Sequence, residues 1–296
     1  MSIPNSEGKL KLGIPKGSLE EATIQLFAKS GWKIRKNSRN YFPAINDPEL
    51  SVSLARPQEI PRYVADGVMD VGLSGKDWIL ENDADVVVVS DLIYSKVSTK
   101  PARWVLAVAG NSPYHKVADL EGARVATEIL GVARKFFEQA GVNVKVEYSW
   151  GATEAKVVEG LADAIIEVTE TGSTIDAHGL RIIADVMETN TQLIANRQAW
   201  ADPFKRRKIE QIDLLLQGAL RAENMVGLKM NVPTANLDKV IAIVPSLNYP
   251  TVANLQNPDW VALEIVVDVD TVRDLIPELK ANGAEGIIEY SLNKVI

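Results

Sequence analysis

Acids and hydroxyls follow a short apolar run at residues 163–174, which read DAIIEVTETGST. The run predicts a buried strand, and the small polar residues after it predict a turn into a helix. A glycine between hydroxyl side chains exposes N–H and O–H donors to an anion, and the helix dipole favours negative charge there. The stretch therefore favours a phosphate cradle, although an ordinary Ser/Thr-rich turn has the same pattern.

The carboxylates beside this cradle need a separate explanation, because acids repel phosphate. Glu167 could accept hydrogen bonds from sugar hydroxyls, and a divalent cation could offset further phosphate charge. The hydroxyls and carboxylates together suit the binding of a phosphorylated ribose with magnesium. Asp163 stands before the strand, where its side chain could instead cap a turn, and Glu170 could be a solvated loop acid. Both structural alternatives stay open.

Cations, glycines and one further acid occupy the ends of other predicted strands. Lys16, Gly17, Arg56 and Gly75 each lie where a strand ends, the edge at which open α/β sheets bind ligands. Glu154, in the loop after another strand, could approach a nucleophile or a metal. It could equally be a first-turn acid favoured by the helix dipole.

These residues must be positioned by alternating strands and helices, the pattern of a mostly parallel α/β sheet. The pattern occurs twice. Gly67 and Gly160 are 93 residues apart, as are Asp70 and Asp163, within DGVMDVGLSG and EGLADAIIEV. We interpret the repeat as two similar lobes, which implies a cleft.

The rest of the chain has a different organisation. Asp202 as N-cap and Pro203 at the first position predict one long helix that connects the lobes to a final section. That section reads strand, helix, strand, strand, helix, strand, the order of a ferredoxin-like sandwich. The domains that we expect are lobe 1 with the connector helix at 1–98 and 190–224, lobe 2 at 99–189 and a third domain at 225–296.

Composition limits the classes of function. The 296 residues are 46% apolar and 24% charged, as in soluble globular proteins. A net charge of -7 argues against nucleic-acid or anionic-membrane binding, so we expect KRRK at 205–208 to be a solvated face. Without cysteine and with two histidines, any metal should be oxygen-bound. No apolar run reaches the roughly 18 residues of a membrane span, which predicts a cytoplasmic protein.

The stretch at 163–174 resembles the phosphoribosyl-pyrophosphate signature of the ATP phosphoribosyltransferase family. The resemblance covers nearly the whole chain. LGIPKGSL, RPQEIPRYVADGVMDVGLSGKD and SWGATE resemble catalytic motifs, and NMVGLKMNVP, YPTVANL, WVALEIVV and GAEGIIEYSLNKV resemble the regulatory domain of the long form. It implies a catalytic part like a type II periplasmic binding protein. It also implies magnesium-dependent condensation of ATP with phosphoribosyl pyrophosphate to phosphoribosyl-ATP and pyrophosphate, the first step of histidine biosynthesis.

The resemblance also implies roles for individual residues. Glu167 would bind the ribose hydroxyls, while Lys16 and Arg56 would meet pyrophosphate or the ATP phosphates. Ser18 stands where the family commonly has Arg, and its capping-box spacing to Glu21 predicts a helix cap instead. The residues assigned to the 5′-phosphate are Thr171, Gly172, Ser173 and Thr174.

Regulation and assembly are likewise implied by the resemblance. Histidine would inhibit by binding at 225–296, with Thr251 and Asn254 as candidate contacts, and the chain would form dimers and hexamers without a separate regulatory subunit. Two other functions stay open on the residues alone. The same lobes could make a non-catalytic solute-binding protein or sensor, or a phosphoribosyltransferase for another base.

Overall fold

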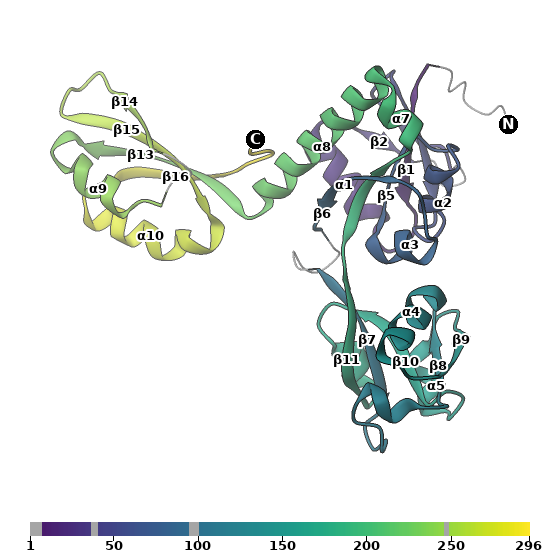
Figure 1. Cartoon of the computed structure of the whole chain (residues 1–296). Coiled ribbons are helices and arrows are strands. Elements are labelled where there is room, and N and C mark those ends of the chain that lie inside the picture. The colour runs from purple at the N-terminus through teal and green to yellow at the C-terminus, as the bar shows by residue number, and fades with distance from the viewer. Residues whose placement is uncertain (1–7, 37–40, 95–100, 246–248) are drawn as a thin grey trace. The chain divides into compact units, whose positions relative to one another are not determined.

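The computed structural model describes residues 8–36, 41–94, 101–245 and 249–296 (Figure 1). The chain forms two compact units. One comprises Met1–Ala28 and Trp32–Asp213, and the other Lys29–Gly31 and Leu214–Ile296. The first unit contains two five-stranded sheets and the second a four-stranded sheet. Among the described residues, none of the helices combines the length and apolarity that crossing a membrane would need.

The first sheet has the strand order β4-β1-β5-β12-β6. Its strands are parallel except β12, which is antiparallel to both neighbours. The strands are β1 (Leu10–Pro15), β4 (Leu50–Ala55), β5 (Val71–Gly75), β6 (Val87–Leu92) and β12 (Thr191–Ala195). The helices of this lobe are α1 (Glu20–Ser30), α2 (Ile60–Ala65), α3 (Lys76–Glu81) and α7 (Arg197–Ala201), and a small pair of strands is formed by β2 (Ile34–Arg35) and β3 (Ala44–Ile45).

The second sheet has the order β11-β7-β10-β8-β9, with β7 antiparallel to its two neighbours. Its strands are β7 (Ala102–Ala109), β8 (Arg124–Thr127), β9 (Lys145–Tyr148), β10 (Ala164–Thr169) and β11 (Leu180–Thr189). The helices around it are η1 (Val117–Leu120), α4 (Leu130–Ala140), α5 (Thr153–Val158) and α6 (Ser173–Ala177). Gly141 ends α4 with φ 67°, the left-handed conformation that its position after the helix predicted.

The two sheets repeat one design, as the spacing in the sequence indicated. Read as β9-β8-β10-β7-β11, the second sheet matches β4-β1-β5-β12-β6, and β10 takes the place of β5. The repeat extends to side chains. The Asp70 carboxylate accepts the Lys11 N–H at 2.9 Å, and the Asp163 carboxylate accepts the Arg124 N–H at 2.8 Å. Each aspartate returns its own N–H to the carbonyl of the same partner residue.

Besides the short strands β2 and β3, two strands of the five-stranded sheets, β11 and β12, were not predicted. β12 is buried along its whole length, so it lacks the alternation of a half-exposed strand. β11 has two register shifts against β7, which interrupt the period of two. Both strands therefore lack the pattern from which the other strands were inferred.

The predicted capping box at Ser18 is wrong. Helix α1 begins at Glu20, so Ser18 and Glu21 are not in the positions of an N-cap and its partner. The Glu20 carboxylate accepts the Gly17 N–H at 3.4 Å instead, and it pairs with Lys36 at 2.5 Å. Ser18 is exposed and does not have the predicted role of a helix cap.

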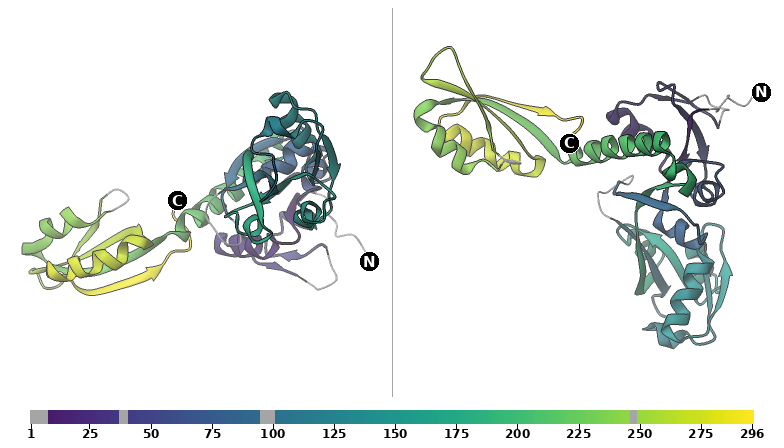
Figure 2. Two further views of the ribbon diagram at one scale, coloured as in Figure 1. Left: turned by 90° about the horizontal axis from the view of Figure 1, so that it is seen from below. Right: turned by 45° about the horizontal axis from the view of Figure 1, so that its top comes forward.

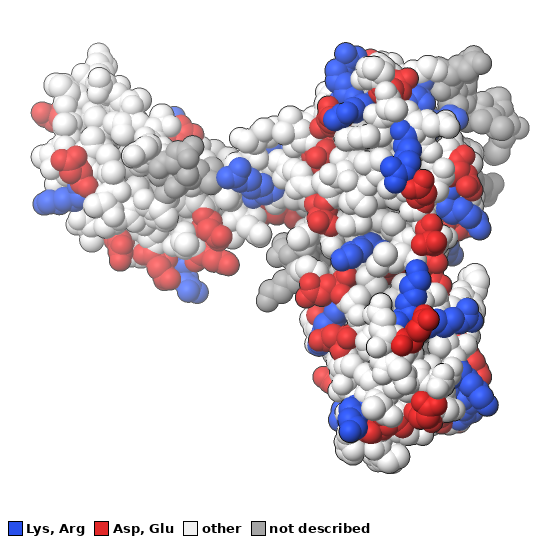
Figure 3. All heavy atoms as spheres, in the orientation of Figure 1, with Lys and Arg blue, Asp and Glu red and all other residues white. Residues whose placement is uncertain are grey.

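Helix α8 (Pro203–Glu223) confirms the single long helix predicted after Asp202, and the Asp202 carboxylate caps it by accepting the Lys205 N–H at 2.9 Å. The expectation of a solvated basic face is wrong for Lys208, which is 7% exposed. Its ammonium lies 2.7 Å from both Asp47 and Glu49. On the face shown in Figure 3, acidic and basic side chains of the described residues are interspersed.

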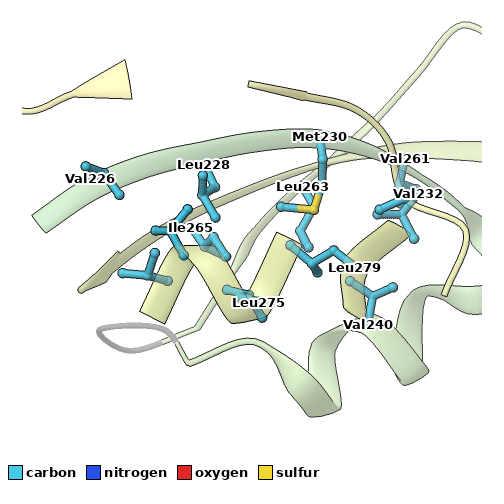
Figure 4. Close-up of a cluster of buried hydrophobic side chains, with 13 residues drawn as sticks. Val226, Leu228, Met230, Val232, Val240, Val261, Leu263, Ile265, Leu275 and Leu279 are labelled. Atoms are coloured by element: carbon cyan, nitrogen blue, oxygen red, sulfur yellow. The ribbon is translucent and has the colours of Figure 1, made fainter. Parts of the chain in front are cut away.

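The C-terminal sheet has the order β14-β15-β13-β16, and all its neighbouring strands are antiparallel. Its elements are β13 (Met225–Pro233), η2 (Thr234–Asn236), α9 (Leu237–Ile243), β14 (Thr251–Asn254), β15 (Trp260–Asp268), α10 (Val269–Ala281) and β16 (Glu285–Ser291). Helices α9 and α10 cover the same face of the sheet (Figures 1 and 2). Alternate residues of β13 and β15 point toward them and form the core with Val240, Leu275 and Leu279 (Figure 4).

Candidate functional site

The hydroxyl-rich turn lies between β10 and α6, as predicted. Gly172 has φ 86°, a left-handed conformation that favours glycine, and α6 begins at the next residue. The Thr169 hydroxyl accepts the Gly172 N–H at 2.8 Å, and Thr171 and Ser173 are joined through their hydroxyls at 2.9 Å. Thr171, Ser173 and Thr174 are exposed. The turn thus presents three hydroxyls to solvent. Its backbone is held in place by Thr169, which is 9% exposed and was not among the predicted site residues.

Glu167 lies on β10, close before this turn, and its environment is unusual. Burial raises the pKa of Glu167 to about 7, and the carboxylates of Glu154 and Glu128 act in the same direction. Hydrogen bonds from the Thr153 hydroxyl and the Val168 N–H oppose the rise. The structure therefore brings the predicted Glu154 and Glu167 into one acidic cluster. It adds Glu128, which follows β8 and was not predicted.

The loop before α5 holds Glu154 in this cluster. Ala152 has φ 49° and Gly151 has φ 67°, and a left-handed non-glycine residue is uncommon outside constrained turns. Thr153 is fully buried, and its hydroxyl lies 3.0 Å from that of Ser149. Trp150 is 85% exposed and meets Tyr148 edge-on, with 6.2 Å between the ring centroids. The indole, four residues before Glu154 in the sequence, thus faces solvent and meets the Tyr148 ring at its edge.

Lys16 and Arg56 lie at neighbouring strand ends in the first lobe. Their positions follow from the parallel pairing of β1 with β4, in which Pro15 is opposite Ala55. The Lys16 ammonium lies over the Tyr41 ring, 4.1 Å from its centroid, and the Arg56 side chain is exposed. Gly17 has φ 117° and is exposed. The structure therefore places both predicted cations and the glycine at one edge of the sheet.

A cavity of about 310 Å³ lies within the first unit and is lined by residues of both lobes. Of the predicted site residues, only Gly75 and Glu170 line it. Thr171, Gly172, Ser173, Glu167 and Lys16 are outside its lining, so the cavity adjoins the hydroxyl-rich turn only through Glu170. The other residues that matter here are Ser18, Trp78, Tyr94, Trp104, Glu128 and Asn190. Aromatic rings and a few polar groups are typical of pockets that hold a planar organic ligand.

Gly75 is required by the packing at this cavity. A Cβ atom at Gly75 would lie 2.1 Å from Oδ1 of Asp77. Asp77 is 5% exposed and accepts the indole N–H of Trp104 at 2.7 Å. Burial raises the pKa of Asp77. Gly75 therefore leaves room for the Asp77 carboxylate, which joins the first lobe to Trp104 in the core of the second.

Asp163 lies at the start of β10, at the opposite end from the hydroxyl-rich turn. Its carboxylate accepts bonds from the Arg124 guanidinium at 3.2 and 3.1 Å as well as from the Arg124 N–H. Hydrogen bonds from Arg124 hold the pKa of Asp163 below its usual value. Asp70 in the first lobe has the same pair of backbone bonds, but its carboxylate forms its ion pair with Lys205 at 2.8 Å. These contacts favour the structural alternative for Asp163.

The two candidate histidine contacts, Thr251 and Asn254, lie on β14, and both are exposed. β14 is an edge strand that pairs with β15. Their accessibility is compatible with ligand binding, and their role stays a prediction.

Within the described part of the chain, no group of three His, Cys, Asp or Glu side chains is arranged to hold a metal ion. The donor set near the turn nevertheless consists of carboxylates, the ligands that magnesium prefers. Magnesium in nucleotide enzymes is commonly held by one or two carboxylates together with substrate phosphates. Glu154 and Glu167, whose charges act on each other, fit a site with two carboxylates.

The chain is similar to proteins of known family. Residues 56–218 match the family model described as ATP phosphoribosyltransferase, and residues 222–294 match the one described as the HisG C-terminal domain. An ATP phosphoribosyltransferase of Nitratidesulfovibrio vulgaris (strain Miyazaki F) is 74% identical over 97% of this chain and 98% of its own length. One of Solidesulfovibrio magneticus is 66% identical over 98% and 99%.

The fold is also similar to that of a solved structure. The structure described as the ATP phosphoribosyl transferase (HisG:HisZ) complex from Thermotoga maritima aligns with a TM-score of 0.60 and 27% identity. The alignment covers 70% of this chain and 96% of that one.

Proposed function

The chain belongs to the ATP phosphoribosyltransferase family, and from this premise we propose how its residues divide the work of the reaction. The enzyme condenses ATP with phosphoribosyl pyrophosphate in the first step of histidine biosynthesis. N1 of adenine forms a bond to C1 of the ribose, and the bond from C1 to pyrophosphate breaks. The products are phosphoribosyl-ATP and pyrophosphate. The match at 222–294 corresponds to the long form of the enzyme.

The reaction asks mainly for positioning and charge stabilisation. Pyrophosphate leaves with its negative charge while the ribose ring gains cationic character. Lys16 and Arg56, at adjacent strand ends, are proposed to hold pyrophosphate or the ATP phosphates, and Gly17 lets the backbone approach them. Thr171, Gly172, Ser173 and Thr174 are proposed to hold the 5′-phosphate.

The observation that carries the proposal is Glu167 beside the hydroxyl-rich turn. Its carboxylate is held in a partly desolvated cluster with Glu154 and Glu128, which raises its pKa to about 7. A carboxylate in such a place gains from two ribose hydroxyl donors, because they restore the hydrogen bonds lost to burial. Its negative charge also stabilises the cationic ring during the displacement.

The remaining predicted residues take supporting places. Glu154 is proposed to approach the adenine, where its carboxylate would accept the proton that the 6-amino group loses after bond formation at N1 leaves the purine ring positively charged. Glu170 and Gly75 line the aromatic cavity, which is proposed to hold the purine ring. Bound to the substrate phosphates and to carboxylates of the acidic cluster, magnesium would supply Lewis-acid stabilisation of the pyrophosphate.

We propose that the catalytic part is similar to type II periplasmic binding proteins, with lobes at 1–98 plus 190–224 and at 99–189. The equivalent strand orders of the two sheets support this. For residues 225–296 we propose a ferredoxin-like regulatory domain, supported by the order β14-β15-β13-β16 and its antiparallel pairing. Histidine would bind there near Thr251 and Asn254, and the chain would assemble as dimers and hexamers without a separate regulatory subunit.

The direct test mixes the purified protein with ATP, phosphoribosyl pyrophosphate and magnesium, and measures pyrophosphate release together with the mass of the nucleotide product. Phosphoribosyl-ATP is expected. Folded protein that binds both ligands and releases no pyrophosphate would instead be a solute-binding protein. Turnover only when another base replaces ATP would place the chain among other phosphoribosyltransferases.

A further inference from the structure

Helix α4 of the second lobe begins without a cap of its own. Its N-cap residue, Ile129, has no side chain that can accept a hydrogen bond. The first N–H groups of a helix lack partners inside the helix, and a polar N-cap residue normally serves the second or third of them. In α4 these two positions are Gly131 and Val132.

Glu81, at the end of α3 in the first lobe, takes over this capping role. Its two carboxylate oxygens accept the Gly131 N–H and the Val132 N–H, each at 3.0 Å. The negative charge also meets the positive end of the α4 dipole, so both bonds are charge-assisted. A residue 50 positions before Gly131 thus caps a helix of the other lobe.

The other end of α3 is fixed to the second lobe as well. There, the buried Asp77 carboxylate accepts the Trp104 indole N–H, and the Trp78 ring meets Trp104 edge-on with 6.4 Å between centroids. The six-residue helix α3 therefore holds the second lobe at both its ends.

The segment that Glu81 caps leads directly to the candidate site. Ile129 is fully buried, and the residue before it is Glu128. Glu128 lines the aromatic cavity and acts electrostatically on Glu167. A shift of the α4 start relative to α3 would therefore move Glu128 relative to Gly75 and Trp78, which line the same cavity.

We propose that Glu81 is a positioning residue, which sets the spacing of the two lobes by capping α4 across the cleft and so keeps the substrate-binding groups of both lobes in register. The inference rests on the proposed function. Loss of the cap would let free enzyme populate arrangements that do not bind substrate, which raises apparent Michaelis constants by the inverse of the competent fraction. Once both substrates are bound they hold the lobes together, so kcat should change little.

The test uses full-length Glu81→Ala and Gly131→Ala variants and their double mutant. Removal of a capping acceptor typically changes an equilibrium about five- to tenfold. Glu81→Ala should therefore raise KM for both substrates about five- to tenfold while kcat stays within about twofold. Glu81→Gln should lie between Glu81→Ala and wild type, because its amide retains one oxygen acceptor.

Gly131→Ala separates positioning from simple stability. Alanine favours the helix relative to glycine, but its Cβ would lie 3.2 Å from the Glu81 carboxylate. It should therefore raise KM in wild-type background without lowering the melting temperature, and leave KM unchanged when Glu81 is already Ala. A non-additive cycle of this kind identifies direct coupling between the two residues.

A structural readout completes the experiment. The chain has no cysteine, so spin labels at Val68→Cys and Gln139→Cys report one distance between the lobes. The distance distribution should broaden in Glu81→Ala and narrow again with both substrates. Unchanged KM, or equal losses of kcat and stability with an unchanged distance distribution, would overturn the proposal. A wild-type protein that forms no phosphoribosyl-ATP would refute the proposed function, whereas an active wild type with an unaffected Glu81→Ala variant would refute only the role of Glu81.

Discussion

Replacing Glu167 by Gln should stabilise the protein at neutral pH while it removes activity. Glu167 has a pKa of about 7 in the folded protein against an ordinary value of 4.5. Between these pH values the folded state holds one proton more than the unfolded state, so the free energy of unfolding falls as pH rises through this window. Above about pH 7 the folded protein must keep an ionised carboxylate in a partly buried, acidic place.

The size of the effect follows from the same pKa. Each pKa unit corresponds to about 1.36 kcal/mol. Since water still reaches this half-buried side chain, we expect the pH-dependent cost to be about 2–3 kcal/mol. Glu167→Gln should therefore lack the part of the pH dependence of the unfolding free energy that Glu167 contributes in wild type. Its advantage in unfolding free energy over wild type should grow by about 2–3 kcal/mol from pH 4.5 to pH 8.

The assay is urea unfolding from pH 4.5 to 8, followed by tryptophan fluorescence, with Glu138→Gln on the exposed face of α4 as the matched control. The control shows how removal of an exposed carboxylate of the same lobe changes the free energy of unfolding over this pH range. A difference in unfolding free energy between Glu167→Gln and wild type that is constant with pH would refute the burial argument.

The same carboxylate should control the pH dependence of catalysis. In kinetic assays kcat/KM of wild type should rise about tenfold per pH unit up to about pH 7, and kcat/KM of Glu167→Gln should be at least about 100-fold lower than that of wild type.

Three further substitutions test other parts of the structure. Thr171→Val should raise KM for phosphoribosyl pyrophosphate about tenfold by removing a phosphate donor. Steady-state kinetics measure this, and an unchanged KM, with Thr251→Val as control, would count against the cradle. Lys208→Met should lower the free energy of unfolding by about 3 kcal/mol, because the substitution leaves Asp47 and Glu49 without their cation. Urea titration measures this change. The control, Lys29→Met at an exposed ion pair, should lower the free energy of unfolding by less than about 1 kcal/mol. Asn254→Ala should weaken histidine inhibition with unchanged kcat, and inhibition curves identical to wild type would place the effector elsewhere.

Features with local signals were predictable from the sequence. Gly141 ends α4 and Asp202 caps α8 because the chemistry of each helix end is written within a few residues. The turn at Gly172 was predictable for the same reason. The repeat of Asp70 and Asp163 was also visible, since equal spacing preserves equal positions on two similar sheets.

Features that depend on distant pairing were not predictable. Glu81 and Gly131 are 50 residues apart, and no local pattern marks a cap supplied by another helix. Glu128 enters the acidic cluster only because β8 lies beside β10. Lys208 appeared to belong to a solvated basic run, yet Asp47 and Glu49 reach it from a different part of the chain. In each case the energy comes from tertiary contacts that override local composition.

The central position of β12 has a consequence for how the chain folds during synthesis. β12 lies between β5 and β6, although it is made roughly 100 residues after β6 ends at Leu92. At translation rates of about 5–20 residues per second, the first sheet lacks this strand for about 5–20 s. The strands of the second sheet, by contrast, are all contained in 102–189. The second lobe can therefore be complete before the first, and until residue 195 has left the ribosome, β5 and β6 present unpaired edges to other nascent chains.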